Sequence, residues 1–202
     1  MAVSLAKGQK ISLKKENGSD LVSFCIGANW GQIEKKGFFG TKKEEVDLDL
    51  SVGMFDSNKN LAKENIIYFG NLQAGGIKHS GDDRGGDSGG DDGLDNEVIT
   101  INLPQIPANI DQVVFVLNSF KGQDFAGIPF ASIRLYEGTP SKVNEVVATY
   151  NIASDPKFAG YVSMILGKLY RRNGEWKFSA IGEPTQDKDL GATLQTVQQK
   201  YL

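Results

Sequence analysis

Residues 46–55 read VDLDLSVGMF, and the strict alternation of apolar and polar side chains in this stretch decides the fold class. A period of two residues places successive side chains on opposite faces of a strand. The apolar face carries Val46, Leu48, Leu50, Val52 and Met54, and the opposite face carries Asp47, Asp49 and Ser51. The stretch therefore predicts a half-buried strand. Composition alone favours a solvated polar face for the two carboxylates.

Similar patterns recur along most of the chain. Residues 22–27 and 98–103 alternate in the same way, and residues 112–117 (QVVFVL) form a continuous apolar run that is typical of a central strand covered on both faces. Further strands are expected over residues 131–136, 146–152, 161–171 and 175–181. Asn173-Gly174 stands between the last two runs, and this dipeptide favours the type I′ turn of a tight hairpin.

One segment at the C-terminus has the periodicity of a helix. Leu190, Leu194, Val197 and Tyr201 fall on one face of a 3.6-residue period, with Asp187 and Asp189 near the expected start. Roughly eight to ten short strands followed by one helix predict a mainly β protein. We expect a two-sheet β-sandwich with a C-terminal helix, formed as a single domain over residues 1–202.

Composition limits the class of protein. The 202 residues are 40% hydrophobic and carry a net charge of −3, which is typical of a soluble domain and gives no reason to expect nucleic-acid binding. The N-terminus lacks the apolar region of a secretory signal, and no apolar run approaches the roughly 20 residues of a membrane span. Cys25 is the single cysteine, so an internal disulfide is excluded. A cytoplasmic protein is expected.

Residues 81–97 (GDDRGGDSGGDDGLDNE) concentrate negative charge, with seven acids, six glycines and a single basic residue, Arg84. Carboxylates this close repel one another, at about 1 kcal/mol for a pair about 4 Å apart in water. Calcium takes roughly 6–8 oxygen ligands, and glycine lets the backbone bend around an ion. The segment therefore predicts a Ca²⁺ site. Its candidate ligands are Asp82, Asp83, Asp87, Asp91, Asp92, Asp95 and Glu97.

Several motifs, taken in order, resemble the TerD/TerZ tellurium-resistance (stress-response) family. They are HSGDDR at residues 79–84 with DNE at 95–97, VDLDL at 46–50, RLY at 134–136, and GKLYRRNGEWKF at 167–178. The resemblance covers nearly the whole chain. It implies a calcium-binding β-sandwich of the bacterial cytoplasm, linked to resistance to tellurite, phage and other stresses. It also implies no established catalytic activity, and partners among the other proteins of the same resistance system.

The resemblance also suggests how the acids are grouped. Asp47 and Asp49 project from one face of their strand, and they would complete a site begun by Asp82 and Asp83. Asp91, Asp92, Asp95 and Glu97 would close that site or form a second one. The chain departs from the family pattern at Asp83, where Asn is usual, and in Asn29-Trp30-Gly31, where the family has Gly-Trp-Asp and one more carboxylate.

Parts of the sequence are also compatible with two other functions. His79, Ser80 and Asp82 invite a hydrolase interpretation, but a nucleophile, its base and the residue that orients the base normally come from distant chain positions. We therefore expect no catalytic residues and no enzyme. The alternative to a calcium module is a metal-dependent binder or enzyme acting on an oxyanion or a phosphate-containing small molecule.

Residues 34–43 combine basic and aromatic side chains in an expected loop. Lysines flanking two phenylalanines can dock on an anionic membrane or an acidic partner, giving a peripheral location at the inner membrane. The opposing interpretation is that the phenylalanines enter the core while the lysines stay in water. The residues concerned are Lys35, Lys36, Phe38, Phe39, Lys42 and Lys43.

Overall fold

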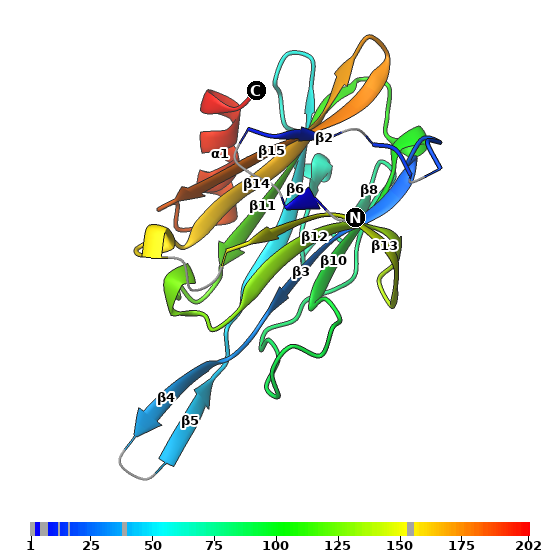
Figure 1. Ribbon diagram of the computed structural model, residues 1–202. Helices are drawn as coiled ribbons and strands as arrows, with labels where there is room; N and C mark the ends of the chain where they lie inside the picture. The colour runs from blue at the N-terminus through cyan, green and yellow to red at the C-terminus, as the bar shows by residue number, and fades with distance from the viewer. Residues whose placement is uncertain (1–2, 5–7, 12, 16, 38–39, 153–155) are drawn as a thin grey trace.

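The protein is a sandwich of two sheets with one helix packed on the outside (Figure 1). The computed structural model describes residues 3–4, 8–11, 13–15, 17–37, 40–152 and 156–202. Apart from one parallel pair, the strands of both sheets are antiparallel, and this architecture confirms the predicted two-sheet β-sandwich with a C-terminal helix.

The seven-stranded sheet has the order β1 (Val3–Ser4), β13 (Lys142–Asn151), β12 (Ala131–Thr139), β3 (Ser23–Trp30), β10 (Glu97–Asn102), β9 (Ile77–His79) and β8 (Gln73–Ala74). The six-stranded sheet has the order β2 (Lys10–Ile11), β15 (Glu175–Thr185), β14 (Ser163–Arg172), β11 (Ile110–Ser119), β6 (Leu48–Asp56) and β7 (Ile66–Ile67).

The remaining elements lie outside the two sheets. They are the hairpin of β4 (Ile33–Gly37) and β5 (Gly40–Glu44), the helix α1 (Leu190–Lys200), and four 3₁₀ turns, η1 (Lys63–Asn65), η2 (Leu103–Gln105), η3 (Phe125–Gly127) and η4 (Pro156–Phe158). Among the described residues, no helix has the length and apolar character needed to cross a bilayer.

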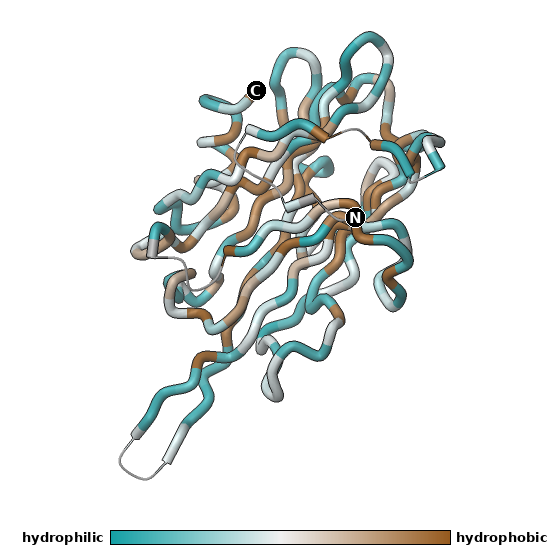
Figure 2. The backbone as a smooth tube through the Cα atoms, viewed as in Figure 1, coloured by the Kyte–Doolittle hydropathy of each residue, from teal (hydrophilic) through white to brown (hydrophobic). Residues whose placement is uncertain are grey.

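Apolar side chains fill the space between the sheets, and smaller apolar clusters lie on the outer face of each sheet. Figure 2 shows apolar residues along the strands and polar residues along the loops and the β4–β5 hairpin. In β11, Val113, Phe115 and Leu117 belong to the core between the sheets, whereas Val114 and Val116 pack on the outer face. Burial of both faces explains why residues 113–117 are all apolar, and it confirms the prediction of a central strand.

Helix α1 covers that outer face. Leu194 and Val197 of the helix join Phe55, Val114, Val116 and Ile165 of the sheet in a second apolar cluster. Asp189 caps the helix by accepting a hydrogen bond of 2.8 Å from the Ala192 N–H, which is the role expected of an acid at that position. Asn173 and Gly174 both have positive φ, 53° and 81°, as the predicted type I′ turn between β14 and β15 requires.

Three expectations from the sequence are wrong in detail. The polar side of residues 46–55 is not solvated, because Asp47, Asp49 and Ser51 are all buried. Val22 lies before β3 and is 48% exposed, so it is not part of the inward face. Residues 34–43 are not a loop, because they lie largely in the β4–β5 hairpin, which projects away from the sandwich (Figure 1). The phenylalanines at positions 38 and 39 lie outside the described residues.

The α1 packing gives a stability prediction. Leu194→Ala removes a buried side chain from the cluster under the helix, so we expect it to lower the free energy of unfolding by about 2–4 kcal/mol. Gln195→Ala alters the exposed neighbour and should change it by about 0.5 kcal/mol or less. Urea denaturation followed by circular dichroism measures both. Equal midpoints for the two variants would contradict this packing.

Candidate metal centre

The acidic segment connects β9 to β10 at one end of the sandwich, next to the base of the β4–β5 hairpin (Figure 1). Backbone hydrogen bonds hold its first half in place. Asp87 exchanges bonds with Trp30 and Gln32 at 2.9 and 3.1 Å, and the Val46 N–H donates to the Gly85 carbonyl oxygen at 3.0 Å. The segment therefore lies against the end of β3 and the start of β6, which are parts of opposite sheets.

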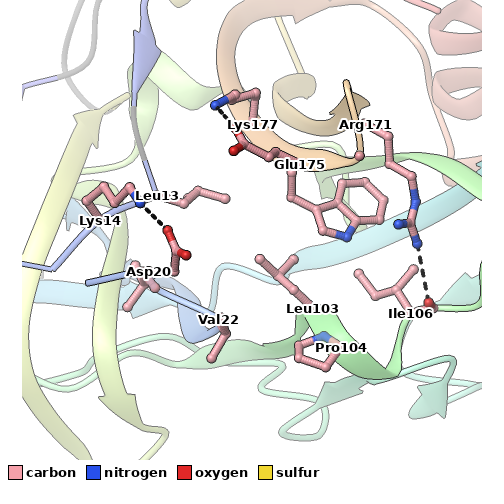
Figure 3. Close-up of a pocket in the computed structure, with 13 residues that line it drawn as sticks. Leu13, Lys14, Asp20, Val22, Leu103, Pro104, Ile106, Arg171, Glu175 and Lys177 are labelled. Atoms are coloured by element: carbon pink, nitrogen blue, oxygen red, sulfur yellow. Dashed lines mark hydrogen bonds and ion pairs between the residues drawn. The ribbon is translucent and has the colours of Figure 1, made fainter. Parts of the chain in front are cut away.

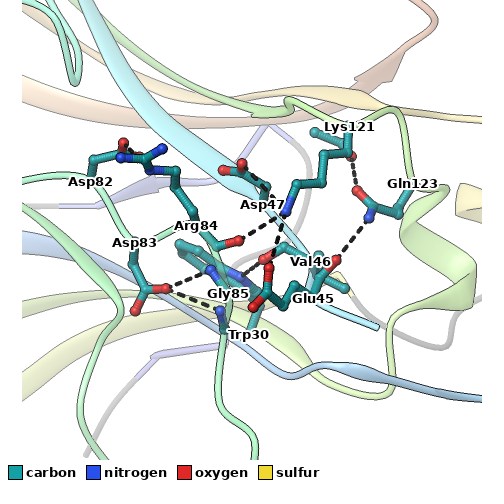
Figure 4. A network of polar contacts seen from close by, with 12 residues as sticks. Trp30, Glu45, Val46, Asp47, Asp82, Asp83, Arg84, Gly85, Lys121 and Gln123 are labelled. Carbon is teal, nitrogen blue, oxygen red and sulfur yellow. Dashed lines mark hydrogen bonds and ion pairs between the residues drawn. The ribbon is translucent and has the colours of Figure 1, made fainter. Parts of the chain in front are cut away.

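Asp47, Asp49 and Asp82 form the first acidic cluster, and their carboxylate oxygens lie within 4.8 Å of one another. Asp47 and Asp49 are 3% and 8% exposed, whereas Asp82 is exposed to solvent. Two cations flank the cluster (Figure 4): Lys121 Nζ lies 3.8 Å from Asp47 Oδ2, and Arg84 Nε lies 3.2 Å from Asp82 Oδ2. The structure thus brings together three predicted ligands that are separated by up to 35 positions in the chain.

Burial and mutual repulsion disfavour the ionised form of the two buried carboxyls in this cluster. Burial, followed by the neighbouring charges of Glu97, Asp47 and Asp82, raises the pKa of Asp49 to about 7. Burial also raises the pKa of Asp47, and the positive charge of Lys121 opposes that shift. A bound divalent cation would remove both penalties, because it supplies the charge that desolvated carboxylates lack.

Asp87, Asp91 and Asp92 form the second acidic cluster, with carboxylate oxygens again within 4.8 Å. This cluster lies nearer the surface, since only Asp87 is partly buried. Burial raises the pKa of Asp87, and the hydrogen bond from Asn96 opposes the shift. Asn29 donates to Asp91 Oδ1 at 2.8 Å, while the Asn29 Oδ1 atom is buried with no hydrogen-bond partner in the described part of the chain. A neutral oxygen is therefore available beside these acids.

The Gly31 position explains one departure from the family pattern. A Cβ atom at Gly31 would lie 2.3 Å from Phe130 Cε1, so this chain has no room there for a carboxylate side chain. Gly31 instead pairs through its backbone with Asp87. Asn29, which the sequence analysis did not single out as a ligand, is the side chain that reaches the second acidic cluster from this part of β3.

Asp83, Asp95 and Glu97 belong to neither acidic cluster, and their carboxylate oxygens contact other groups of the chain. Asp83 Oδ1 accepts from the N–H groups of Gly85 and Gly86 at 2.9 and 3.0 Å, which closes a turn. Asp95 lies against Gly27 and forms an ion pair of 2.8 Å with Arg134. Burial raises the pKa of Asp95, and Arg134 opposes the shift.

Glu97 is fully buried and completes an unfinished strand edge. Strand β7 pairs with β6 only at Val52 and Gly53, so Leu50 has no neighbouring strand on that side. Glu97 Oε2 accepts from the Leu50 N–H at 2.8 Å, and His79 Nε2 lies 2.9 Å from the Leu50 carbonyl oxygen. Glu97 Oε1 also accepts from the Asp83 N–H at 3.2 Å. Side chains from the seven-stranded sheet thus replace a strand beside the first acidic cluster.

Asn96 organises the segment in a way that the sequence analysis missed. Its Oδ1 accepts from the Trp30 N–H at 2.8 Å, and its Nδ2 donates to Asp83 and Asp87 at 3.2 and 3.0 Å. The residue type could have indicated this role, because a carboxamide at the end of an acidic run can donate hydrogen bonds to carboxylates without adding charge. Neutral donors, as well as cations, therefore hold these carboxylates in place.

His79 and Ser80 do not form a nucleophile and base pair. His79 is 2% exposed, its Nδ1 accepts from the Gly81 N–H at 3.0 Å, and its Nε2 therefore carries the proton that faces Leu50 and Glu97. Ser80 Oγ accepts from the Val98 N–H at 2.9 Å. Both side chains are therefore used in contacts with the backbone at the end of β9 and the start of β10.

A separate hollow of about 410 Å³ lies between the β14–β15 turn and the N-terminal part of the chain (Figure 3). Its charged side chains are already paired: Lys14 with Asp20, and Lys177 with Glu175. Arg171 lies over the Trp176 ring at 4.4 Å from the centroid. Trp176 itself is partly buried and packs against the core between the sheets. The charged side chains named here therefore already have partners within the chain.

Comparisons with known proteins agree with the fold and the motifs. The TerD domain family matches residues 1–196. Stress response protein SCP2 of Bacillus subtilis (strain 168) is 39% identical over 201 residues, covering 94% of this chain and 96% of its own. Tellurium resistance protein TerX of Serratia marcescens is 36% identical over 218 residues, covering 96% and 98%. A crystal structure of a homologue of telluride resistance protein (TerD), SCO6318 from Streptomyces coelicolor A3(2), has a TM-score of 0.64 at 15% identity, covering 85% and 94%, and shows the same fold.

The buried Asp49 carboxyl predicts an unusual dependence of stability on pH. Because its pKa is raised on folding, the folded protein holds this proton more tightly than the unfolded chain does, and the group lowers stability as pH rises from about 4 through about 7. In a chelator, Asp49→Asn should therefore gain stability relative to the parent between about pH 5 and about pH 8, on the order of 2 kcal/mol. Denaturant titrations at the two pH values measure the difference.

Asp56, at the other end of β6, supplies a control of opposite sign. Backbone and side-chain hydrogen bonds from Asn60 lower the pKa of Asp56, so its contribution is present at neutral pH and is lost as pH falls. Asp56→Asn should be less stable than the parent at about pH 8, and the deficit should shrink in acid. A pH-independent difference between Asp49→Asn and the parent would contradict the burial of an uncompensated carboxyl.

Proposed function

This chain belongs to the TerD domain family, and from that membership we propose that it is a calcium-binding, non-catalytic stress-response module of the cytoplasm that takes part in resistance to tellurite or phage. The observation that supports calcium most strongly is the first acidic cluster. Three carboxylates from β6, the residue before it and the acidic segment meet at one end of the sandwich, two of them buried. Oxygen ligands of this kind suit a hard divalent cation.

Asp47, Asp49 and Asp82 would hold one Ca²⁺ ion, and Asp87, Asp91 and Asp92 would hold another. The ion would supply charge compensation at both clusters, and it would stabilise the folded state by about RT ln(1 + [Ca]/Kd). The unpartnered Asn29 Oδ1 beside Asp91 is a further oxygen for the second ion. Asp83, Asp95 and Glu97 would act by positioning the segment, since other groups already engage their oxygens.

The acidic segment contacts the β4–β5 hairpin, so ion binding in the segment could change the position of this projecting hairpin. Lys43 of β5 donates a hydrogen bond to the Ser88 carbonyl oxygen, and the Gln32 N–H just before β4 donates to the Asp87 carbonyl oxygen. An ion that orders residues 87–92 would fix these contacts and therefore the base of the hairpin. Such an ordered surface would recruit proteins of the same resistance system.

A second candidate function, docking on a membrane, is favoured by the shape and charge of the hairpin. The hairpin projects from the sandwich (Figure 1). Four of its residues are exposed lysines: Lys35, Lys36, Lys42 and Lys43. Lys35 and Lys42 stand directly opposite each other in the register. Lys35 forms an ion pair with Glu44 of the same hairpin, and an anionic surface would attract the exposed lysines that project with it.

Calorimetric titration of the demetallated protein with Ca²⁺ tests the ion sites. We expect Asp82→Asn and Asp92→Asn each to weaken one binding event by about tenfold or more, because each removes a charged ligand from a different cluster. Asp111→Asn, near the start of β11 and far along the strand from the first acidic cluster, is the matched control and should bind as the parent does. Unchanged titrations for both cluster variants would overturn the assignment.

A thermal-shift comparison separates the calcium module from the oxyanion alternative. The chelated protein is melted with calcium, magnesium or tellurite added singly and in pairs. A rise in melting temperature with calcium alone supports the module. A rise that requires the oxyanion supports the alternative of a metal-dependent binder or enzyme.

Cosedimentation with vesicles of anionic lipid tests docking. Changing Lys35, Lys36, Lys42 and Lys43 to Gln should reduce the pelleted fraction strongly, since each lysine near such a surface is worth about 1 kcal/mol. The matched control changes four exposed lysines elsewhere, Lys63, Lys78, Lys142 and Lys200, to Gln. The same loss in both variants, or no pelleting of the parent with or without calcium, would exclude the hairpin as a membrane contact.

A further inference from the structure

A cavity of about 280 Å³ lies on the outer face of the six-stranded sheet, beside the first turn of α1. Its floor is polar and is formed by Asp49 and Ser51 of β6 and Asn118 of β11. Its rim is aromatic and is formed by Tyr68, Phe69 and Phe120, with residues 188–191 closing the side next to the helix. The proposed function leaves Ser51, Asn118 and the three aromatic side chains without a role.

The orientation of the Asn118 amide is fixed by its neighbours. Its Nδ2 donates to Ser163 Oγ at 2.6 Å and to Thr193 Oγ1 at 2.8 Å. Both hydroxyls use their own protons on backbone carbonyl oxygens, Ser163 on Asp187 and Thr193 on Asp189. They can therefore only accept from Asn118, and a flipped amide would face two oxygens with no proton between them.

This network leaves oxygen atoms without donors at the floor of the cavity. Ser163 and Asp49 flank Asn118 from neighbouring strands, so an amide nitrogen turned toward Ser163 leaves Oδ1 on the Asp49 side. Asn118 is 4% exposed and Ser51 is 1% exposed, and neither Asn118 Oδ1 nor Ser51 Oγ has a hydrogen-bond partner within the part of the chain that the structure describes. Buried acceptors of this kind favour a ligand that brings donors, because unmet polar atoms cost about 1–3 kcal/mol each.

The rim has the character of a site for a cation. Phe69 and Phe120 meet edge to face with centroids 6.0 Å apart, and Tyr68 meets Phe69 in the same way at 5.1 Å. Phe120 is 65% exposed, which is unusual for so large an apolar side chain. Aromatic faces attract organic cations. Lys188 at the rim is exposed to solvent. Asp189 is engaged in capping α1, which leaves Asp49, at the floor, as the acid that could bind a cation.

We propose that this cavity binds a primary alkylammonium group, with the ammonium on the floor and the alkyl chain under the aromatic rim. An ammonium carries three N–H donors, and Asp49, Ser51 and Asn118 each offer it an oxygen. The same chemistry is found in a free aliphatic amine and in the lysine side chain of a partner protein. The cavity lies next to the first acidic cluster through Asp49, but it does not depend on a metal ion.

The test is a calorimetric titration of the full chain with n-pentylammonium chloride in the presence of a chelator, so that loss of calcium binding does not affect the result. We expect saturable one-to-one binding below about 10 mM, and binding of uncharged n-pentanol weaker by about tenfold or more. No binding up to about 10 mM, or equal binding of the alcohol, would overturn the proposal.

Variants locate the binding within the cavity. Phe120→Ala changes an exposed residue and should weaken pentylammonium binding by about tenfold, and Ser51→Ala by about threefold or more. Val22→Ala, which also removes an exposed apolar side chain but lines the separate hollow near Trp176, should bind as the parent does. Equal affinity in the parent and the Phe120→Ala variant, with unchanged melting temperature, would place the amine elsewhere and overturn the assignment.

A second ligand distinguishes the two sources of the ammonium group. Nα-acetyl-lysine N-methylamide presents the same side chain attached to a peptide backbone. Binding as strong as that of pentylammonium supports a lysine of a partner protein as the occupant. Binding about tenfold weaker supports a free amine, because the cavity then excludes the backbone.

Discussion

The geometry of the acidic end depends on how one unpaired strand edge is satisfied. Strand β6 pairs with β11 on one side and runs past the end of β7 on the other, which leaves one edge open at Leu50. Glu97 and His79 reach across from the seven-stranded sheet and meet the Leu50 N–H and carbonyl oxygen. A buried peptide group that lost these partners would cost about 1–3 kcal/mol. This contact therefore fixes the two sheets relative to each other where the carboxylates gather.

Placing Glu97 there has an electrostatic consequence. Its charge adds to that of Asp47 and Asp82 in raising the pKa of Asp49, and burial raises the pKa of Glu97 itself. The contact between Glu97 and Leu50 thus also places a further negative charge next to the first acidic cluster. A cation at the first acidic cluster would offset that charge, so we infer that closure of the fold and affinity for a cation are coupled at this end of the molecule.

The outer face of β6 is apolar near one end of the strand and polar near the other. Toward its end, Phe55 packs under α1 in an apolar cluster. Toward its start, Asp49 and Ser51 face a cavity whose aromatic rim includes Phe69 and Phe120. The helix covers only part of the sheet: Thr193 accepts a hydrogen bond from Asn118, and Leu194 and Val197 pack on the apolar part. The uncovered part is where polar side chains remain available to ligands.

The sequence by itself determined most of the longer strands, the C-terminal helix and the resemblance to the family, but not the β4–β5 hairpin. Alternation identified the strands, the positive φ of Asn173-Gly174 followed from the residue types, and the 3.6-residue spacing identified α1, because each of these signals is local. The density of acidic residues in residues 81–97 was sufficient to predict a cation site there. Only the tertiary structure decided that Asp47 and Asp49 are buried and that six of the predicted ligands come together in two clusters. Those outcomes depend on which distant strands pair and on where an edge is left open, and no local period encodes either.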